Sequence, residues 1–212
     1  MATLRELAYE KRGNALVNNL ESRHFEAYYC HTKKDALQKA LDLIPENASV
    51  AWGGALSAEQ IGLLDAVRSG SFKALDRDAC LSQEEKDQIA YSCFGADVFI
   101  TGANGISLDG QMVNIDGTGN RVAAIVYGPK TVIVIAGMNK VMDTLDEAIR
   151  RARTVAAPLN QQRFQLPNPC TATGTCGDCK SLTCICNQIL ITRHCRPAGR
   201  IKFILVGEDL GL

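Results

Sequence analysis

Residues 131–136 read TVIVIA and are almost purely β-branched. A run that is apolar on both alternating faces is typical of a strand in a parallel sheet covered by helices on either side. Similar apolar runs recur along the chain, at residues 49–52, 72–76, 96–101 and 200–206. Between them lie segments with helical spacing of apolar residues, at residues 3–22, 33–44 and 143–156. Strands that alternate with helices predict an α/β fold with a mainly parallel central sheet flanked by helices.

Two stretches in the middle of the chain carry more local expectations. Residues 106–115 and 121–127 are predicted to be strands, separated by a turn that starts at Asp116. A helix is expected to begin near Ser57, because Ser57 and Gln60 have the spacing of a capping box.

Length, charge and hydropathy limit the function classes. The chain has 212 residues, a length that predicts one domain, 1–212. It has 23 basic and 23 acidic side chains, and this zero net charge argues against a general nucleic-acid binder. No apolar run approaches about 18 residues and the first residues are charged, so we expect neither membrane insertion nor a secretory signal. The expected location is cytoplasmic. Thiols stay reduced there, so the nine Cys indicate metal ligands or reactive thiols.

Six of the nine Cys lie in one segment, residues 160–198, which we expect to be an irregular Cys-rich insertion in the single domain. They are Cys170, Cys176, Cys179, Cys184, Cys186 and Cys195. The spacing C-x5-C-x2-C-x6-C over Cys170, Cys176, Cys179 and Cys186 favours a 4Fe–4S cluster. Zinc is the alternative, although structural zinc usually shows two CxxC knuckles, and unmetallated thiols are a third reading. Residues 148–212 hold 9 basic and 3 acidic side chains, a surplus suited to offset thiolates or a bound anion.

Glycine-rich loops follow three of the predicted strands. Ligands of open parallel sheets sit outside the carboxyl ends of the strands, so we expect a pocket there for a small anionic metabolite. Its predicted members are Gly53, Gly54, Ser57, Glu59, Thr101, Gly102, Asn104, Asp109, Asp116, Gly117, Gly119, Asn120 and Lys140. Glu59 is the candidate catalytic base, and Asn120 with Arg121 can contact a phosphate or carboxylate. The alternative is that these glycines only make turns and that Glu59 only interacts favourably with the dipole at the start of its helix.

Several of these stretches, including VAWGGALSAEQIGL, TGANGISLDGQMVNIDGTGNR and GRIKFILVGEDLG, closely resemble the LUD (lactate-utilisation) domain family. The resemblance implies a fold shared with ribose-phosphate isomerases and CoA transferases. It also implies a cysteine motif PC-x5-C-x2-C-x6-C-N, which matches Cys170, Cys176, Cys179 and Cys186, followed by Asn187. The family pattern tends to carry Arg where this chain has Cys184 and Pro where it has Leu182, which leaves open whether Cys184 or Cys195 replaces one of these ligands.

Two functions from different classes are consistent with these features. The first is an iron–sulfur redox or electron-transfer component linked to lactate or a related 2-hydroxy acid, working with a redox partner protein. The second is an isomerase- or transferase-type enzyme, or a sensor, that binds a phosphorylated or CoA-linked anion and carries a structural metal. No nucleophile–base pair identifies a reaction, so enzyme status stays open. A homodimer is a reasonable expectation for a symmetric assembly of a soluble chain.

Overall fold

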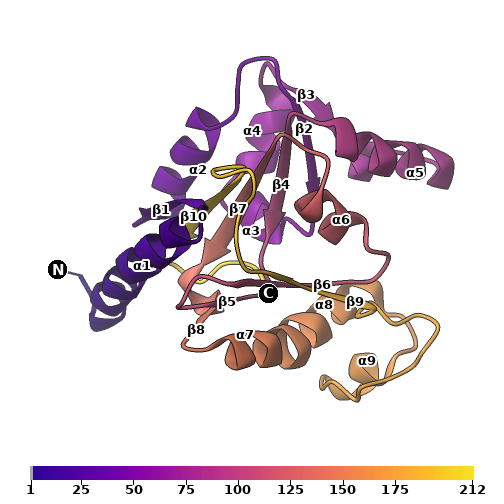
Figure 1. Ribbon diagram of the computed structural model, residues 1–212. Coiled ribbons are helices and arrows are strands. Elements are labelled where there is room, and N and C mark those ends of the chain that lie inside the picture. The colour runs from indigo at the N-terminus through magenta and orange to yellow at the C-terminus, as the bar shows by residue number, and fades with distance from the viewer. Residues whose placement is uncertain (1) are drawn as a thin grey trace.

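The structure is a computed structural model that describes residues 2–212. Its main sheet has six parallel strands in the order β1-β10-β7-β4-β2-β3 (Figure 1). Their bounds are β1 (Glu26–Cys30), β2 (Ser49–Gly53), β3 (Lys73–Leu75), β4 (Val98–Gly102), β7 (Thr131–Gly137) and β10 (Ile201–Val206). The predicted α/β fold with a mainly parallel sheet is therefore confirmed.

The strand β7 shows why the TVIVIA run decides the fold. It lies between β10 and β4. Val132 and Val134 face one apolar core, while Ile133 and Ile135 face the other, and all four are fully buried. Burial on both faces requires helices on both sides of the sheet, as the sequence pattern predicts.

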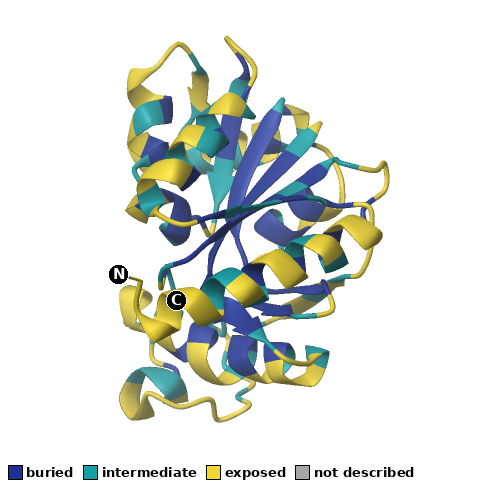
Figure 2. Cartoon of the chain, turned by 90° about the vertical axis from the view of Figure 1, so that its left-hand side faces the viewer, coloured by how far each residue is buried: buried dark blue, intermediate teal, exposed yellow. Residues whose placement is uncertain are grey.

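Helices cover the two faces of the sheet, and Figure 2 shows buried residues on the strands and exposed residues on the outer sides of the helices. The core on one face includes residues of α2, α3 and α4, and the core on the other includes residues of α1 and α6. The helices are α1 (Leu4–Ser22), α2 (Lys33–Asp42), α3 (Leu56–Gln60), α4 (Leu63–Ser69), α5 (Gln83–Ser92), α6 (Asn120–Val126), α7 (Leu145–Arg151), α8 (Ala157–Phe164) and α9 (Pro169–Thr173). Single turns add η1 (Arg77–Ala79), η2 (Cys93–Gly95), η3 (Met138–Lys140) and η4 (Ala152–Ala156), the last a π-helical turn joining α7 to α8.

A second sheet of four strands was not predicted. Its order is β8-β5-β6-β9, with β8 (Val141–Met142), β5 (Gly105–Ser107), β6 (Met112–Asp116) and β9 (Gln188–Thr192). A small core of Val113, Ile115, Ala148 and Ala152 joins it to α7 and η4. Residues 160–198 include the end of α8, the short helix α9 and the strand β9, which joins this sheet. Part of the Cys-rich segment is therefore regular structure.

Two local predictions are wrong. Residues 121–126 belong to the helix α6 and not to a strand, because the Asp116 carboxylate accepts backbone N–H groups in the first turn of the helix. The capping box at Ser57 is absent, because α3 begins one residue earlier and its N-cap position is Ala55.

No helix within residues 2–212 combines the length and the apolar character that a membrane span requires.

Candidate functional site

Three parallel strands end side by side at one edge of the large sheet. β2 ends at Gly53, β4 at Gly102 and β7 at Gly137. The strand registers place Gly53 beside Thr101, and Gly102 beside Ile135, so the following loops leave from the same edge. The structure thus brings together loops that the sequence singled out.

Ser57 and Lys140 meet at this edge. Ser57 belongs to α3, and Lys140 is the last residue of η3, directly after β7. Lys140 Nζ donates a hydrogen bond of 3.0 Å to Ser57 Oγ. Both side chains are buried, so an amine and a hydroxyl from distant parts of the chain face each other away from solvent.

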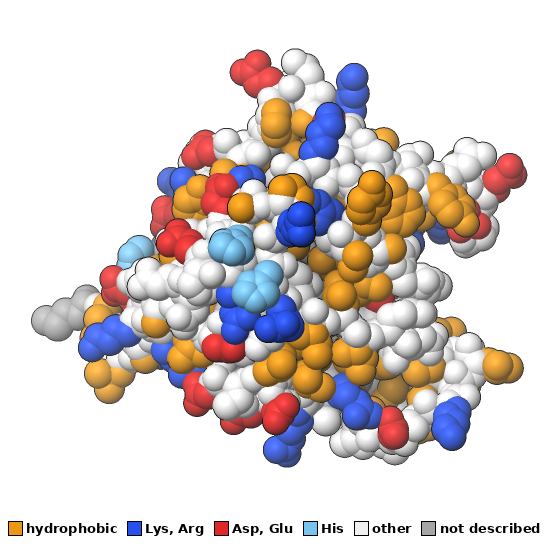
Figure 3. All heavy atoms as spheres, viewed as in Figure 1, with side chains coloured by type: hydrophobic (Ala, Val, Ile, Leu, Met, Phe, Trp, Pro, Cys, Tyr) orange, Lys and Arg blue, Asp and Glu red, His pale blue; other side chains and the backbone are white. Residues whose placement is uncertain are grey.

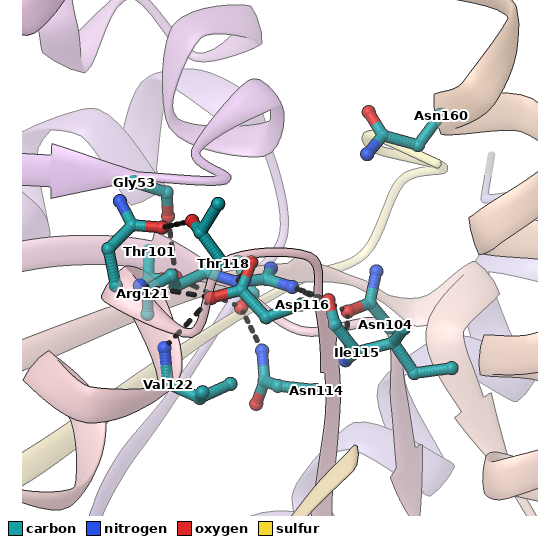
Figure 4. A network of polar contacts seen from close by, with 12 residues as sticks. Gly53, Thr101, Asn104, Asn114, Ile115, Asp116, Thr118, Arg121, Val122 and Asn160 are labelled. Carbon is teal, nitrogen blue, oxygen red and sulfur yellow. Dashed lines mark hydrogen bonds and ion pairs between the residues drawn. The ribbon is translucent and has the colours of Figure 1, made fainter. Parts of the chain in front are cut away.

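Arg121 is buried beside the same loops and lies in a polar network (Figure 4). Its Nη2 donates a hydrogen bond of 2.9 Å to Asn104 Oδ1 and another to the carbonyl oxygen of Ile115. Asp116 Oδ2 accepts the backbone N–H groups of Arg121 and Val122 at 3.0 and 3.2 Å. The loop after β6 therefore fixes the start of α6 and the position of the guanidinium together.

Sequence reasoning missed Arg151, which is also buried. Its Nε donates to the carbonyl oxygen of Asn139 at 3.1 Å, and its Nη1 to the carbonyl oxygen of Asn104 at 2.5 Å. The only signal in the sequence is a basic residue in the last turn of a helix, which usually just complements the helix dipole.

The edge of the sheet therefore holds three buried cations. Burial, together with the positive charges of Arg151 and Arg121, lowers the pKa of Lys140 to about 7. Burial also lowers the pKa of both arginines. Two carboxylates lie near them: Asp116, whose Oδ1 lies 3.9 Å from Arg121 Nε, and that of the last residue, Leu212, which accepts a hydrogen bond of 3.3 Å from Arg151 Nη1. Positive charge outweighs negative charge at this place, and in a buried environment that favours an anion.

Other predicted pocket members lie elsewhere or take other roles. Asp109 sits in the turn between β5 and β6, where its carboxylate binds Arg23, Ser107 and Gln111. Glu59, the candidate base, is exposed on α3. Asn120 Oδ1 accepts a hydrogen bond from Thr118 within its own loop.

Five of the six clustered Cys line one cavity of about 140 Å³. They are Cys170, Cys176, Cys179, Cys184 and Cys186. Cys170 belongs to the short helix α9, and the others lie in the loop between α9 and β9. Burial, and then the neighbouring thiols, raise the pKa of Cys186 to about 12, and burial also raises the pKa of Cys170. A metal that binds here must therefore displace protons from these thiols.

The thiols surround the cavity without meeting at a point. In the part of the chain that the structure describes, no three Cys, His, Asp or Glu side chains come close enough to hold a single metal ion. Cys184 and Cys186 are the nearest to an organised pair, because the backbone N–H of Cys186 donates to Cys184 Sγ at 3.4 Å.

The remaining Cys and the His beside it lie apart from the cavity. Cys195 is buried, with its Sγ donating to the carbonyl oxygen of Pro197 and accepting the backbone N–H of Ile201. The ring centroid of His194 lies 6.2 Å from that of His24. Figure 3 shows histidine side chains next to lysine and arginine side chains on the face that it presents.

The profile of the LUD domain family matches residues 14–206. The chain belongs to the LUD domain family. Its fold is similar to a DUF162 family protein from Deinococcus radiodurans, with a TM-score of 0.54 at 10% identity over 93% of this chain and 97% of that one. A ribose 5-phosphate isomerase A from Methanocaldococcus jannaschii is similar over 54% of this chain and 56% of its own, at 18% identity and a TM-score of 0.35. No curated protein matches the chain.

The cysteine cavity of this LUD domain contains an unsatisfied amide. Gln161 on α8 is fully buried and lines the cavity. Neither its Nε2 nor its Oε1 has a hydrogen-bond partner within residues 2–212. A buried amide without partners is destabilising by about 1–3 kcal/mol, so this group is suited to a ligand in the cavity.

The strand β6 connects the cysteine cavity to the buried cations of the LUD domain. Ile115 lines the cavity, while its carbonyl oxygen accepts Arg121. Asn187, directly after Cys186, donates its backbone N–H to the carbonyl oxygen of Asp116 at 2.9 Å and its side-chain amide to that of Gly117 at 3.0 Å. The two candidate sites are therefore neighbours that share one strand and its loop.

Proposed function

We propose that this LUD-domain protein is an iron–sulfur redox component linked to the use of lactate or a related 2-hydroxy acid. The observation that carries the proposal is the set of five thiols around one cavity, with the unsatisfied amide of Gln161 among them. The family name supports the link to lactate, and the chemistry of the donor set supports the cluster.

The arrangement of thiols favours a cluster over a zinc ion. A zinc ion draws thiolate sulfurs to within about 2.3 Å of one point, whereas a 4Fe–4S cluster takes one thiolate on each of several separated iron atoms. Thiols that surround a cavity of about 140 Å³ fit the larger group better. We propose Cys170, Cys176, Cys179 and Cys186 as its ligands and Cys184 as the alternate, since Cys195 is buried, accepts the backbone N–H of Ile201 and does not line the cavity.

The cavity also provides groups that suit a negatively charged centre. Four thiolates bring more negative charge than an oxidised cluster core neutralises. Arg153 and Asp178 both line the cavity and pair with each other, so a guanidinium lies at its wall beside a carboxylate. When bound, a cluster supplies reversible transfer of single electrons, and this chain's residues hold it and exclude water from one side of it.

A redox titration of the reconstituted, anaerobic protein tests the proposed function. We expect reversible reduction at a potential within the range of about −700 to +450 mV that iron–sulfur clusters span. Protein that carries metal but shows no reversible change in visible absorption would contradict the redox function and leave a structural metal.

The proposal also includes a redox partner protein and a homodimer.

The amide of Gln161 gives a sharper prediction for the same titration. Gln161→Leu keeps the size of the side chain and removes the N–H donor. Hydrogen bonds to cluster sulfurs stabilise the reduced, more negative state, so we expect the reduction potential to fall by about 40 mV, equivalent to about 1 kcal/mol. Gln83→Leu on the exposed helix α5 is the matched control and should leave the potential unchanged. An equal potential in wild type and Gln161→Leu, at equal iron content, would contradict the role of Gln161.

A further inference from the structure

The strongest unexplained feature outside the cysteine cavity is the group of three buried cations at the strand ends. Arg121 and Arg151 are 8% and 9% exposed, and Lys140 is 4% exposed. Asp116 lies near Arg121, and it already accepts two backbone N–H groups at the start of α6. Burying a cation without a matching anion is strongly unfavourable, so this excess of positive charge requires a reason.

The donors of these cations are used unequally. Arg151 gives its N–H groups to the backbone carbonyl oxygens of Asn139 and Asn104 and, at 3.3 Å, to the carboxylate oxygen of the last residue, Leu212, so its charge is partly compensated. Arg121 uses Nη2 on Asn104 and Ile115, but its buried Nε has no hydrogen-bond partner among the described residues. Arg121 therefore has a buried N–H donor that is not used by the protein, whereas Arg151 mainly connects parts of the backbone through its hydrogen bonds.

Glycine backbone lies close against the charged ends of Arg121 and Lys140, where a side chain would clash with them. Gly54 has a φ of +58°, and a Cβ there would lie 2.6 Å from Arg121 Nη1. A Cβ on Gly102 would lie 3.1 Å from the carbonyl oxygen of Gly54 and 3.8 Å from Lys140 Nζ. Gly54 is exposed, so the guanidinium is separated from solvent by a residue without a side chain. Gly211 covers the other side, against Ser57 and Lys140.

We propose that Arg121 and Lys140, with the hydroxyl of Ser57, bind a compact oxyanion: the carboxylate or phosphate group of a small metabolite. Arg121 offers Nε and Nη1, and Lys140 offers the N–H groups not used on Ser57. Charge-assisted hydrogen bonds from these donors compensate the buried positive charge. This site does not depend on a metal in the cysteine cavity.

The state of Lys140 makes binding depend on pH. The charged groups around it are Arg151 from α7, Arg121 from α6, Asp116 at the end of β6, which pairs with Arg121, and the carboxylate of Leu212, which accepts from Arg151. Its pKa of about 7 means that the amine is charged below pH 7 and mostly neutral at pH 9. An oxyanion binds the charged form, so affinity should fall at least about tenfold between pH 7 and pH 9, with proton uptake on binding.

The experiment measures thermal unfolding and calorimetric binding of the full-length, metal-free chain at constant ionic strength. The probes are oxalate, pyruvate and inorganic phosphate, with chloride as the reference. At about 100 times its Kd, a bound oxyanion should raise the Tm by about 5–10 °C. A response to oxalate and pyruvate identifies a carboxylate site, and a response to phosphate identifies a phosphate site. No response above chloride to any probe would overturn the proposal.

Variants assign the effect to these residues. Lys140→Met should weaken binding at least about tenfold and abolish its pH dependence, while the ligand-free Tm stays equal or rises, because a buried charge is removed. Ser57→Ala keeps the charge and should weaken binding by a few fold. Exposed Lys11→Met, on α1, is the matched control and should bind as wild type does. The assignment would be overturned if folded Lys140→Met bound the oxyanion as tightly as the wild-type protein does. It would also be overturned if the wild-type protein bound as tightly at pH 9 as at pH 7.

Discussion

Cys179→Ala is expected to bind less than about one tenth of the iron that the wild-type protein binds after anaerobic reconstitution. Cys179 belongs to the C-x2-C pair with Cys176, and both line the cavity. Cys179 lies in a loop without helix or strand, which metal binding is expected to order. Loss of this thiolate therefore removes one ligand and also weakens the coupled ordering of the loop. Iron and acid-labile sulfide per chain, measured against the wild type, check the prediction.

Three other cysteine variants show whether the effect is specific. Cys195→Ala removes a thiol that lies away from the cavity, and its iron content should equal that of the wild type. Cys184→Ala and Cys186→Ala compare the alternate and the preferred fourth ligand, and we expect the larger loss from Cys186→Ala. Full loading of Cys179→Ala would contradict the ligand assignment.

Phe203→Ala is expected to lower the free energy of unfolding by about 3–5 kcal/mol. Phe203 is fully buried on β10 and packs edge-to-face on Phe25, with ring centroids 5.2 Å apart. Its removal leaves a large cavity in the core between the sheet and α1. For a chain of this length the Tm should fall by about 6–20 °C.

Thermal or denaturant unfolding of the two metal-free proteins measures this difference. Phe164→Ala is the matched control, because Phe164 is 52% exposed at the end of α8. Its effect should stay within about 0.5 kcal/mol. Equal losses of stability in both variants would contradict the position of Phe203 in the core.

The large sheet could be predicted because its strands are buried on both faces. Such strands read as continuous apolar runs, and residues 131–136 and 200–206 are recognised without knowledge of their neighbours. The small sheet could not be predicted, since β9 pairs with β6 from a distant part of the chain, Ile115 opposite Ile189. Its strands are short and lie next to loops, so their pattern is weak.

The error over residues 121–127 has a similar origin. Val122, Ile125 and Val126 are β-branched and imitate a strand, but the side chain of Asp116 caps the first turn and selects a helix. A cap formed from five or six residues away depends on the shape of the loop, which the sequence does not reveal.

Part of the candidate site could be predicted for a physical reason. The topological rule that ligands lie at the carboxyl ends of parallel strands points to Gly53, Gly102 and Lys140. The burial of Arg151 depends on how α7 packs on the small sheet, and the pairing of Asp109 with Arg23 depends on where α1 ends. Both follow from tertiary packing and leave no local signal.

The nearness of the two sites gives the LUD domain its distinctive arrangement. Arg121 holds the carbonyl oxygen of Ile115, whose residue also lines the cysteine cavity, and Asn187 ties the cysteine loop to the loop after β6. An oxyanion at Arg121 would therefore lie one strand away from a cluster in the cavity. Such a distance suits a domain that senses or handles an anionic metabolite next to a redox centre.

The most direct test of the central proposal is the metal and sulfide content of wild-type protein purified without oxygen. We expect about four iron atoms and about four acid-labile sulfides per chain, with the broad visible absorption of a 4Fe–4S cluster. Stoichiometric zinc without iron or sulfide would contradict it.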